Sequence, residues 1–200
     1  MTGNSIFGAS DPMALVRDWM SEAAPKEPND PGAMVLATVD AQGMPNARTV
    51  LLKGIEAQGL VFYTNYDSVK GHEIAATGQA AVVLHWKSIR RQVRARGPVE
   101  RVEPELSDSY YASRPVDSRL GAWASRQSQP LADRETLMAE IEAARARFGD
   151  APPRPPHWGG YRLKPLQMEF WADGPFRLHD REGWTRPDLE TVWSIQRLFP

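Results

Sequence analysis

Short apolar runs separated by turn signals occupy the first half of the chain, and they limit its fold more than any other feature. The runs lie at residues 34–39, 47–52 and 60–64, and turn residues fill the gaps at 40–43 and 57–59. Strands joined by such short turns are usually neighbours in an antiparallel sheet. The pattern therefore predicts a β-meander and disfavours a doubly wound parallel sheet.

The rest of the chain adds strands and helices to this meander. Strands are expected at residues 80–86, 92–102, 161–163, 166–171, 176–179 and 192–199. Helices are expected at residues 12–23, 67–76, 104–113 and 133–148. The first is capped by Asp11, and the second is capped by Asp67 or Ser68 and closed by Gly78. About seven or eight short strands with flanking helices are typical of a small β-barrel with helices packed outside, in the α+β class.

Length and composition indicate one soluble domain. Two hundred residues, at about 150 per domain, predict a single domain over residues 1–200, with residues 1–10 as a flexible N-terminus. The absence of cysteine excludes disulfides and thiolate chemistry, and with only four histidines no metal site is expected. A net charge of −1 favours neither nucleic acid nor an anionic membrane as a partner. Because neither a secretory signal nor a membrane-spanning run is present, the expected location is the cytoplasm.

Basic residues on predicted strands are the first indication of a binding site. If residues 177–181 form a strand, Arg177, His179 and Arg181 share one face, where their charges repel unless an anion or solvent lies there. Lys70 falls in the first turn of a predicted helix, where the helix dipole attracts phosphate. Solvated edge strands, whose charges prevent aggregation, explain the same pattern. The basic pattern alone leaves an anion site and a solvated surface both open.

Longer motifs follow one another in order from about Asp11 to Pro200. They include residues 27–31, 47–53, 61–65, 85–88, 91–93, 113–115, 118–125, 127–128, 155–161, 169–171 and 177–181. Together they resemble the pyridoxine/pyridoxamine 5'-phosphate oxidases, the flavin enzymes that make pyridoxal 5'-phosphate. The resemblance implies a homodimeric FMN-binding split β-barrel, with the flavin in clefts at the subunit interface.

The same resemblance implies which residues form the site. The FMN contacts would be Arg48, Thr49, Val50, Leu51, Leu52, Lys53, Tyr63, Thr64, Lys70, Gln92, Gln127, Ser128, Trp171 and Arg181. The substrate contacts would be Lys53, Tyr110, Arg114, Ser118, Arg177 and His179. Of these, Arg177 and His179 would have the catalytic role of holding the pyridine ring over the flavin, while the others would cradle the substrate phosphate through charge-assisted hydrogen bonds.

The implied reaction belongs to vitamin B6 biosynthesis and salvage. Pyridoxamine 5'-phosphate or pyridoxine 5'-phosphate would be oxidised to pyridoxal 5'-phosphate by hydride transfer to FMN. Dioxygen would reoxidise the flavin and yield hydrogen peroxide, and the amine substrate would release ammonia. Two alternatives stay open: another flavin split-barrel oxidase, for example of the phenazine-biosynthesis type, and a non-catalytic carrier of flavin or pyridoxal phosphate.

Overall fold

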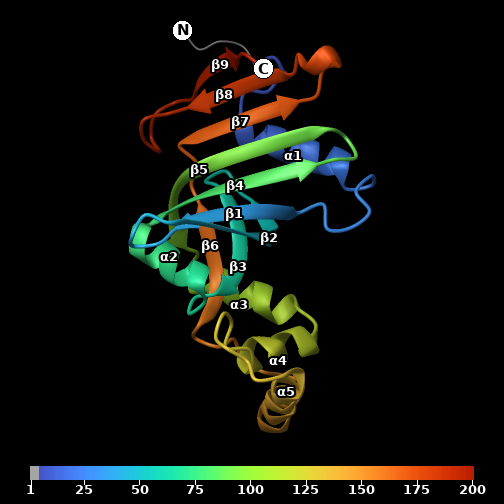
Figure 1. The fold of residues 1–200 in the computed structure, drawn as a ribbon, viewed down its shortest axis with the longest axis vertical. Coiled ribbons are helices and arrows are strands. Elements are labelled where there is room, and N and C mark those ends of the chain that lie inside the picture. Colours follow the sequence, from blue (N-terminus) through green and yellow to red (C-terminus); the bar gives the residue numbers. More distant parts are fainter. Residues whose placement is uncertain (1–4) are drawn as a thin grey trace.

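The computed structural model describes residues 5–200, and its centre is a nine-stranded antiparallel sheet that closes on itself (Figure 1). Its strands are β1 (Ala33–Val39), β2 (Pro45–Ile55), β3 (Leu60–Asn65), β4 (Gln79–Trp86), β5 (Arg91–Arg101), β6 (Trp158–Leu163), β7 (Gln167–Ala172), β8 (Asp180–Thr185) and β9 (Ser194–Leu198). The strand order is β4-β1-β2-β3-β6-β5-β7-β8-β9, and an additional β4–β5 pairing closes the barrel. Residues 91–98 of β5 pair with β4, residues 91–96 also pair with β7, and residues 99–101 pair with β6. The predicted barrel of the α+β class is confirmed.

The predicted meander is β1, β2 and β3, and both of its pairings are antiparallel. Its ladder is regular between β1 and β2, where Met34 lies opposite Val50. Between β2 and β3 the register shifts between Leu52 and Gly54, so Lys53 lies at an irregularity of the ladder. Bulges of this kind change the direction in which a side chain points, and they are common beside functional sites.

Five helices in the described part of the chain flank the barrel: α1 (Pro12–Ala23), α2 (Val69–Thr77), α3 (Pro104–Ser113), α4 (Val116–Ala124) and α5 (Arg134–Phe148). Asp11 caps α1 by accepting hydrogen bonds from the backbone N–H groups of Met13 and Ala14, and Ser68 caps α2. Figure 1 shows α3, α4 and α5 gathered at one end of the barrel, away from β7, β8 and β9. Helix α4 is an element that the sequence patterns do not predict.

The predicted strand at residues 176–179 is wrong. Residues Pro175–Arg177 form a single 3-10 turn, in which the backbone N–H of Leu178 donates to the carbonyl oxygen of Pro175 at 3.0 Å. Phe176 and Arg177 have φ angles of 56° and 65°, which a strand cannot accommodate. Strand β8 begins only at Asp180, so Arg177, His179 and Arg181 do not share one strand face.

Large aromatic side chains fill the barrel, and the N-terminal segment packs against it. Trp19 of α1 contacts Phe170 edge-on, with ring centroids 5.4 Å apart, and Phe7 contacts the same indole at 5.1 Å. Of the residues expected to form a flexible N-terminus, 1–4 lie outside the described residues, whereas the Ser5 hydroxyl donates to the buried Glu182 at 2.7 Å. Among residues 5–200, no helix is long and apolar enough to cross a membrane.

Candidate functional site

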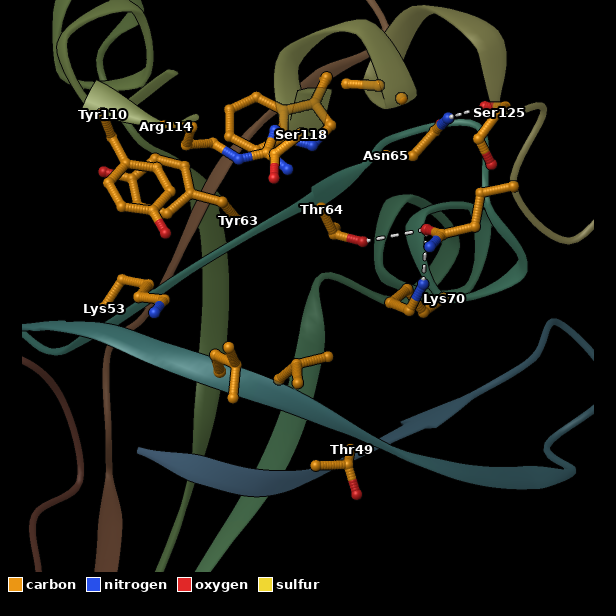
Figure 2. Close-up of a pocket in the computed structure, with 16 residues that line it drawn as sticks. Thr49, Lys53, Tyr63, Thr64, Asn65, Lys70, Tyr110, Arg114, Ser118 and Ser125 are labelled. Atoms are coloured by element: carbon orange, nitrogen blue, oxygen red, sulfur yellow. Dashed lines mark hydrogen bonds between the residues drawn. The ribbon is translucent and has the colours of Figure 1, made fainter. Parts of the chain in front are cut away.

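A cavity of about 470 Å³ lies between β2 and β3 on one side and helices α3 and α4 on the other (Figure 2). Its volume is typical of small-molecule sites. We call it the main cavity. It brings together many of the residues that the sequence motifs assign to the site: Thr49, Val50, Leu51, Lys53, Tyr63, Thr64, Lys70, Tyr110, Arg114, Ser118 and Gln127. None of the described residues that line it carries a carboxylate.

One end of the main cavity is formed by Lys53 and by the corner between α3 and α4. Arg114 is the C-terminal capping residue of α3, and Ser118 lies in the first turn of α4, so the corner directs both side chains at the cavity. The guanidinium of Arg114 stacks on Trp158 at 4.6 Å, and its Nη1 atom is shielded from solvent with no hydrogen-bond partner among residues 5–200. Burial lowers the pKa of Arg114 from its ordinary value. Since buried donors in native proteins are normally paired, this nitrogen is well suited to bind an anion.

Three aromatic rings stack on one another beside these cations. Tyr63 stacks on Tyr110 with centroids 3.9 Å apart and an interplanar angle of 18°, and it is also nearly parallel to Trp158 at 5.6 Å. Burial raises the pKa of Tyr63 to about 12, so its phenol stays neutral at physiological pH. The stack therefore adds neutral aromatic surface to this end of the cavity.

The other end of the main cavity is formed by Lys70, Thr64 and Gln127. The Lys70 amino group donates to Gln127 Oε1 at 3.0 Å, and the Thr64 hydroxyl donates to the same oxygen at 3.3 Å (Figure 2). Lys70 also donates to Ser68 Oγ at 3.2 Å. Burial, together with the nearby charge of Arg48, lowers the pKa of Lys70. Lys70 also lies in the first turn of α2, where the helix dipole favours negative charge. This end can therefore hold a second anionic group.

Three of the predicted cofactor residues lie near the main cavity without lining it. The guanidinium of Arg48 is bound by Glu73 at 2.8 Å, by the carbonyl oxygen of Leu36 at 3.2 Å and by the Thr38 hydroxyl, so it ties α2 to the sheet. The Leu52 side chain is buried in the core. Ser128 lies beside the start of α2, where its hydroxyl accepts a hydrogen bond from the backbone N–H of Val69 at 3.3 Å.

The remaining predicted site residues form a separate cluster, the C-terminal group: Gln92, Trp171, Arg177, His179 and Arg181. The strand register places Gln92 opposite Trp171 and Trp171 opposite Arg181. The His179 ring packs on Trp171 at 4.7 Å, and Arg177 and His179 line a second cavity of about 550 Å³. Within one chain the structure does not bring the C-terminal group to the main cavity.

The two arginines of the C-terminal group differ in their ion pairing. Arg181 makes two hydrogen bonds to Glu169, at 3.1 and 3.0 Å, and Arg94 pairs with the same carboxylate. Burial alone would raise the pKa of Glu169, but the hydrogen bonds from Arg181 and Arg94 hold it below its usual value. Arg177 differs, because its side chain is exposed and has no ion-pair partner among the residues that the structure describes.

Several lining residues of the main cavity are not among the predicted ones: Asn65, Gly121, Ala122, Ser125 and Trp158. Asn65 is anchored by a hydrogen bond from its amide to the carbonyl oxygen of Ser125 at 3.4 Å. All five lie inside the motifs at 61–65, 118–125 and 155–161. Their membership in those motifs is the signal that could have identified them.

Two family matches cover the segments that form the main cavity and the C-terminal group. Residues 20–148 match the family described as pyridoxamine 5'-phosphate oxidase. The chain belongs to this family. Residues 158–200, which include most of the C-terminal group, match the C-terminal dimerisation region of pyridoxine 5'-phosphate oxidase, and this match supports a homodimer.

Relatives within the pyridoxamine 5'-phosphate oxidase family match along their whole length. A protein of Cereibacter sphaeroides named pyridoxine/pyridoxamine 5'-phosphate oxidase is 60% identical over 200 residues, which is 100% of both chains. One of the same name from Paracoccus denitrificans is 58% identical, covering 98% of this chain and 97% of the relative. The chain is therefore an enzyme of the oxidoreductase class.

Solved structures show the same fold. PhzG from Burkholderia lata, in complex with tetrahydrophenazine-1-carboxylic acid, superposes with a TM-score of 0.90 at 34% identity, covering 96% of this chain and 94% of PhzG. An FMN-binding protein of Nostoc punctiforme, related to pyridoxamine 5'-phosphate oxidase, has a TM-score of 0.73 at 18% identity, with coverages of 92% and 97%. The second likeness shows the fold alone.

Proposed function

We propose that this protein oxidises pyridoxamine 5'-phosphate or pyridoxine 5'-phosphate to pyridoxal 5'-phosphate, with FMN as its cofactor. The observation that carries the proposal is the charge pattern of the main cavity. Its two ends hold Lys70 on one side and Lys53 with Arg114 on the other, and no carboxylate lines it in the described chain. A flavin and a substrate bound together would place one phosphate at each of these two cationic ends.

The residues present fit both phosphates. For the FMN phosphate, the hydrogen-bond partners of the Lys70 amino group among residues 5–200 are neutral, Gln127 Oε1 and Ser68 Oγ, so its charge is available to an anion. For the substrate phosphate, Arg114 offers its Nη1 nitrogen, which has no partner among the same residues. The hydroxyls of Tyr110 and Ser118 and the exposed amino group of Lys53 surround the same end and would complete the cradle.

A second copy of the chain would supply the groups that one copy keeps apart. Arg177 and His179 lie on the C-terminal group, within the segment that matches the dimerisation region of the family. In the proposed homodimer, these two side chains of one subunit would orient the pyridine ring bound in the main cavity of the other subunit. The exposure of Arg177 and its lack of an ion-pair partner among residues 5–200 support this role, since the guanidinium is free to meet a ligand.

The proposed reaction balances with dioxygen as the electron acceptor. Pyridoxine 5'-phosphate and dioxygen give pyridoxal 5'-phosphate and hydrogen peroxide. Pyridoxamine 5'-phosphate, dioxygen and water give pyridoxal 5'-phosphate, ammonia and hydrogen peroxide. When bound, FMN would supply the hydride-accepting chemistry, whereas the protein binds the two phosphates, orients the pyridine ring and excludes solvent from the ring faces.

The test is an anaerobic titration of the FMN-loaded protein with pyridoxamine 5'-phosphate, followed by the visible absorbance of the flavin. We expect the substrate to bleach the flavin absorbance and the admission of air to restore it. The amount of pyridoxal 5'-phosphate formed should equal the amount of hydrogen peroxide. A flavin that stays oxidised with this substrate and with pyridoxine 5'-phosphate would contradict the proposal. If a reduced phenazine precursor then bleached the flavin, the function would be of the PhzG type; if no donor did, the protein would be a carrier.

A further inference from the structure

The loop that joins β7 to β8 is strained, and it carries both Arg177 and His179. Phe176 and Arg177 adopt left-handed φ angles of 56° and 65°, conformations that are sterically unfavourable in non-glycine residues. Gly174 lies so close to the loop's far side that a Cβ atom there would be 2.1 Å from the carbonyl oxygen of Leu178. A loop of this shape persists only if other contacts hold it, and these contacts decide where Arg177 and His179 lie.

Asp173 makes the contacts that hold the loop. One carboxylate oxygen, Oδ1, lies 3.1 Å from Nδ1 of His179 at the loop's far end. The other, Oδ2, forms an ion pair with Arg90 in the β4–β5 turn, and the backbone N–H of Asp173 donates to the carbonyl oxygen of Arg90 at 3.1 Å. The side chains of Asp173 and His179 are only 18% and 19% exposed, so their contact is largely shielded from water. Asp173 therefore ties together the start of the loop, its end and a neighbouring turn.

The Nδ1 atom of His179 has two competing partners. Besides the Asp173 carboxylate, the backbone N–H of Gly174 lies 3.3 Å from it. A carboxylate requires a proton on Nδ1, whereas an amide donor requires a lone pair there, so only one of the two hydrogen bonds can form at a time. The neutral ring therefore has two arrangements: with Asp173 engaged, Nε2 is an acceptor, and with Gly174 engaged, Nε2 carries the proton and is a donor.

We propose that Asp173 is a positioning residue that keeps a proton on Nδ1 of His179 and presents Nε2, with its lone pair, to the substrate. This inference rests on the proposed function, in which His179 contacts the pyridine ring of the substrate. The charged carboxylate is the stronger partner of the two, because hydrogen bonds to ionised groups are roughly twice as strong as those between neutral groups. The Trp171 ring, 4.7 Å from the imidazole, limits the other orientations that His179 could take.

The first readout is the protonation of His179 itself, observed by long-range ¹H–¹⁵N NMR of the FMN-loaded protein labelled with ¹⁵N-histidine. The chain has four histidines, and the loss of one signal in His179→Asn assigns the resonance. At a pH at which the ring is neutral, we expect the wild type to carry its proton on Nδ1, with Nε2 unprotonated. A wild-type ring protonated on Nε2 alone would overturn the proposal, whether or not any variant folds. In Asp173→Asn, which keeps the size of the side chain and removes its charge, we expect the neutral ring to shift its proton to Nε2.

The second readout is turnover, and Arg90→Gln is the matched control. This substitution removes the other ion pair of Asp173, at an exposed guanidinium, but leaves the contact with His179 in place. We expect Asp173→Asn to lower kcat about tenfold or more with little change in FMN content or KM for the substrate, and Arg90→Gln to lower it much less. Equal losses in the two variants would assign Asp173 to loop structure alone and overturn the positioning role.

The two readouts separate this inference from the proposed function. If wild-type protein does not oxidise either vitamer phosphate, the proposed function fails, and the NMR measurement alone still decides whether Asp173 holds the His179 proton. If the wild type is active and Asp173→Asn matches it in both kcat and imidazole protonation, the proposed function stands and the positioning role is wrong.

Discussion

The main cavity and the C-terminal group differ in how carboxylates pair with their basic side chains. Among residues 5–200, the hydrogen-bond partners of Lys70 in the main cavity are neutral, and the guanidinium of Arg114 has a buried nitrogen with no partner. In the C-terminal group, Arg181 is held by Glu169 and His179 by Asp173, whereas the exposed Arg177 has no ion-pair partner in the described chain. Burying a cation away from water without a carboxylate partner costs free energy, unless a bound ligand supplies the negative charge. We infer that the main cavity is built to bind anions and the C-terminal group to orient what is bound.

Because the two clusters differ in this way, substitutions in them should alter different kinetic parameters. Under the proposed function, changes in the main cavity would remove contacts with the two phosphates, which take no part in the oxidation and bind equally in the ground state and the transition state. They should therefore alter Kd or KM. Changes in the C-terminal group should alter kcat, because orientation matters most as the substrate approaches the transition state.

The largest expected effect is that of Arg177→Ala. Loss of the free guanidinium of the C-terminal group should lower kcat/KM for pyridoxamine 5'-phosphate about 100-fold, since a small misplacement of a reacting ring costs rate on that scale. FMN should stay bound, as judged by the flavin absorbance after gel filtration. Arg177→Lys, which keeps the charge without the planar fork, should retain part of the rate. If the variant lost flavin but had the wild-type kcat/KM once flavin was restored, Arg177 would bind the cofactor. The C-terminal group would then bind an anion as the main cavity does, and the two clusters would not differ in function.

Arg114→Ala should have the next largest effect, and on a different parameter. Removal of a charged hydrogen bond to the substrate phosphate is expected to cost about 1.5–3 kcal/mol, which corresponds to a KM raised about 10- to 100-fold with kcat nearly unchanged. Steady-state kinetics with saturating FMN measure both parameters. Arg134→Ala, at an exposed arginine at the start of α5, is the control and should change neither. A fall in kcat without a rise in KM would mean that Arg114 orients the substrate, as the C-terminal group does.

Sequence patterns correctly predicted the elements that are determined by residues close together in the chain. The meander of β1, β2 and β3 follows from apolar runs and turn residues that are close in sequence, and the caps Asp11 and Ser68 precede their helices directly. The strand expected at 176–179 failed for the opposite reason. Its alternation of polar and apolar residues imitates a strand. The loop with the left-handed Phe176 and Arg177 is instead held by Asp173, which contacts His179 and the distant Arg90, and no local pattern contains the contacts with Arg90.

The site could be predicted only as a set of residues, and not as two clusters. The approach of Lys53 on β2 to Arg114 at the α3–α4 corner joins segments far apart in the chain, and motif resemblance suggested both residues without their geometry. The pairing of Arg181 with Glu169 depends on the register of β7 and β8, and that of His179 with Asp173 on a strained turn. Carboxylates that neutralise a cation are visible only once the fold is known, so the sequence alone could not separate free cations from paired ones.

The smallest expected effect on function comes from Lys70→Met, which tests the cost of a free cation directly. Without the charged contact to its phosphate, FMN should bind more weakly, with a Kd about tenfold or more above that of the wild type in a fluorescence titration.

The FMN-free variant should nevertheless be more stable to urea than the FMN-free wild type, because a buried ammonium is replaced by an apolar side chain of similar length. Burial lowers the pKa of Lys70 in the folded state, so the unfolded wild type binds more protons and its stability rises with pH up to the ordinary lysine value. The stability difference between variant and wild type should therefore be larger at pH 7 than at pH 10, whereas Lys87→Met, at an exposed lysine, should show no such change. If Lys70→Met bound FMN as tightly as the wild type, the main cavity would not use its free cations to bind the cofactor.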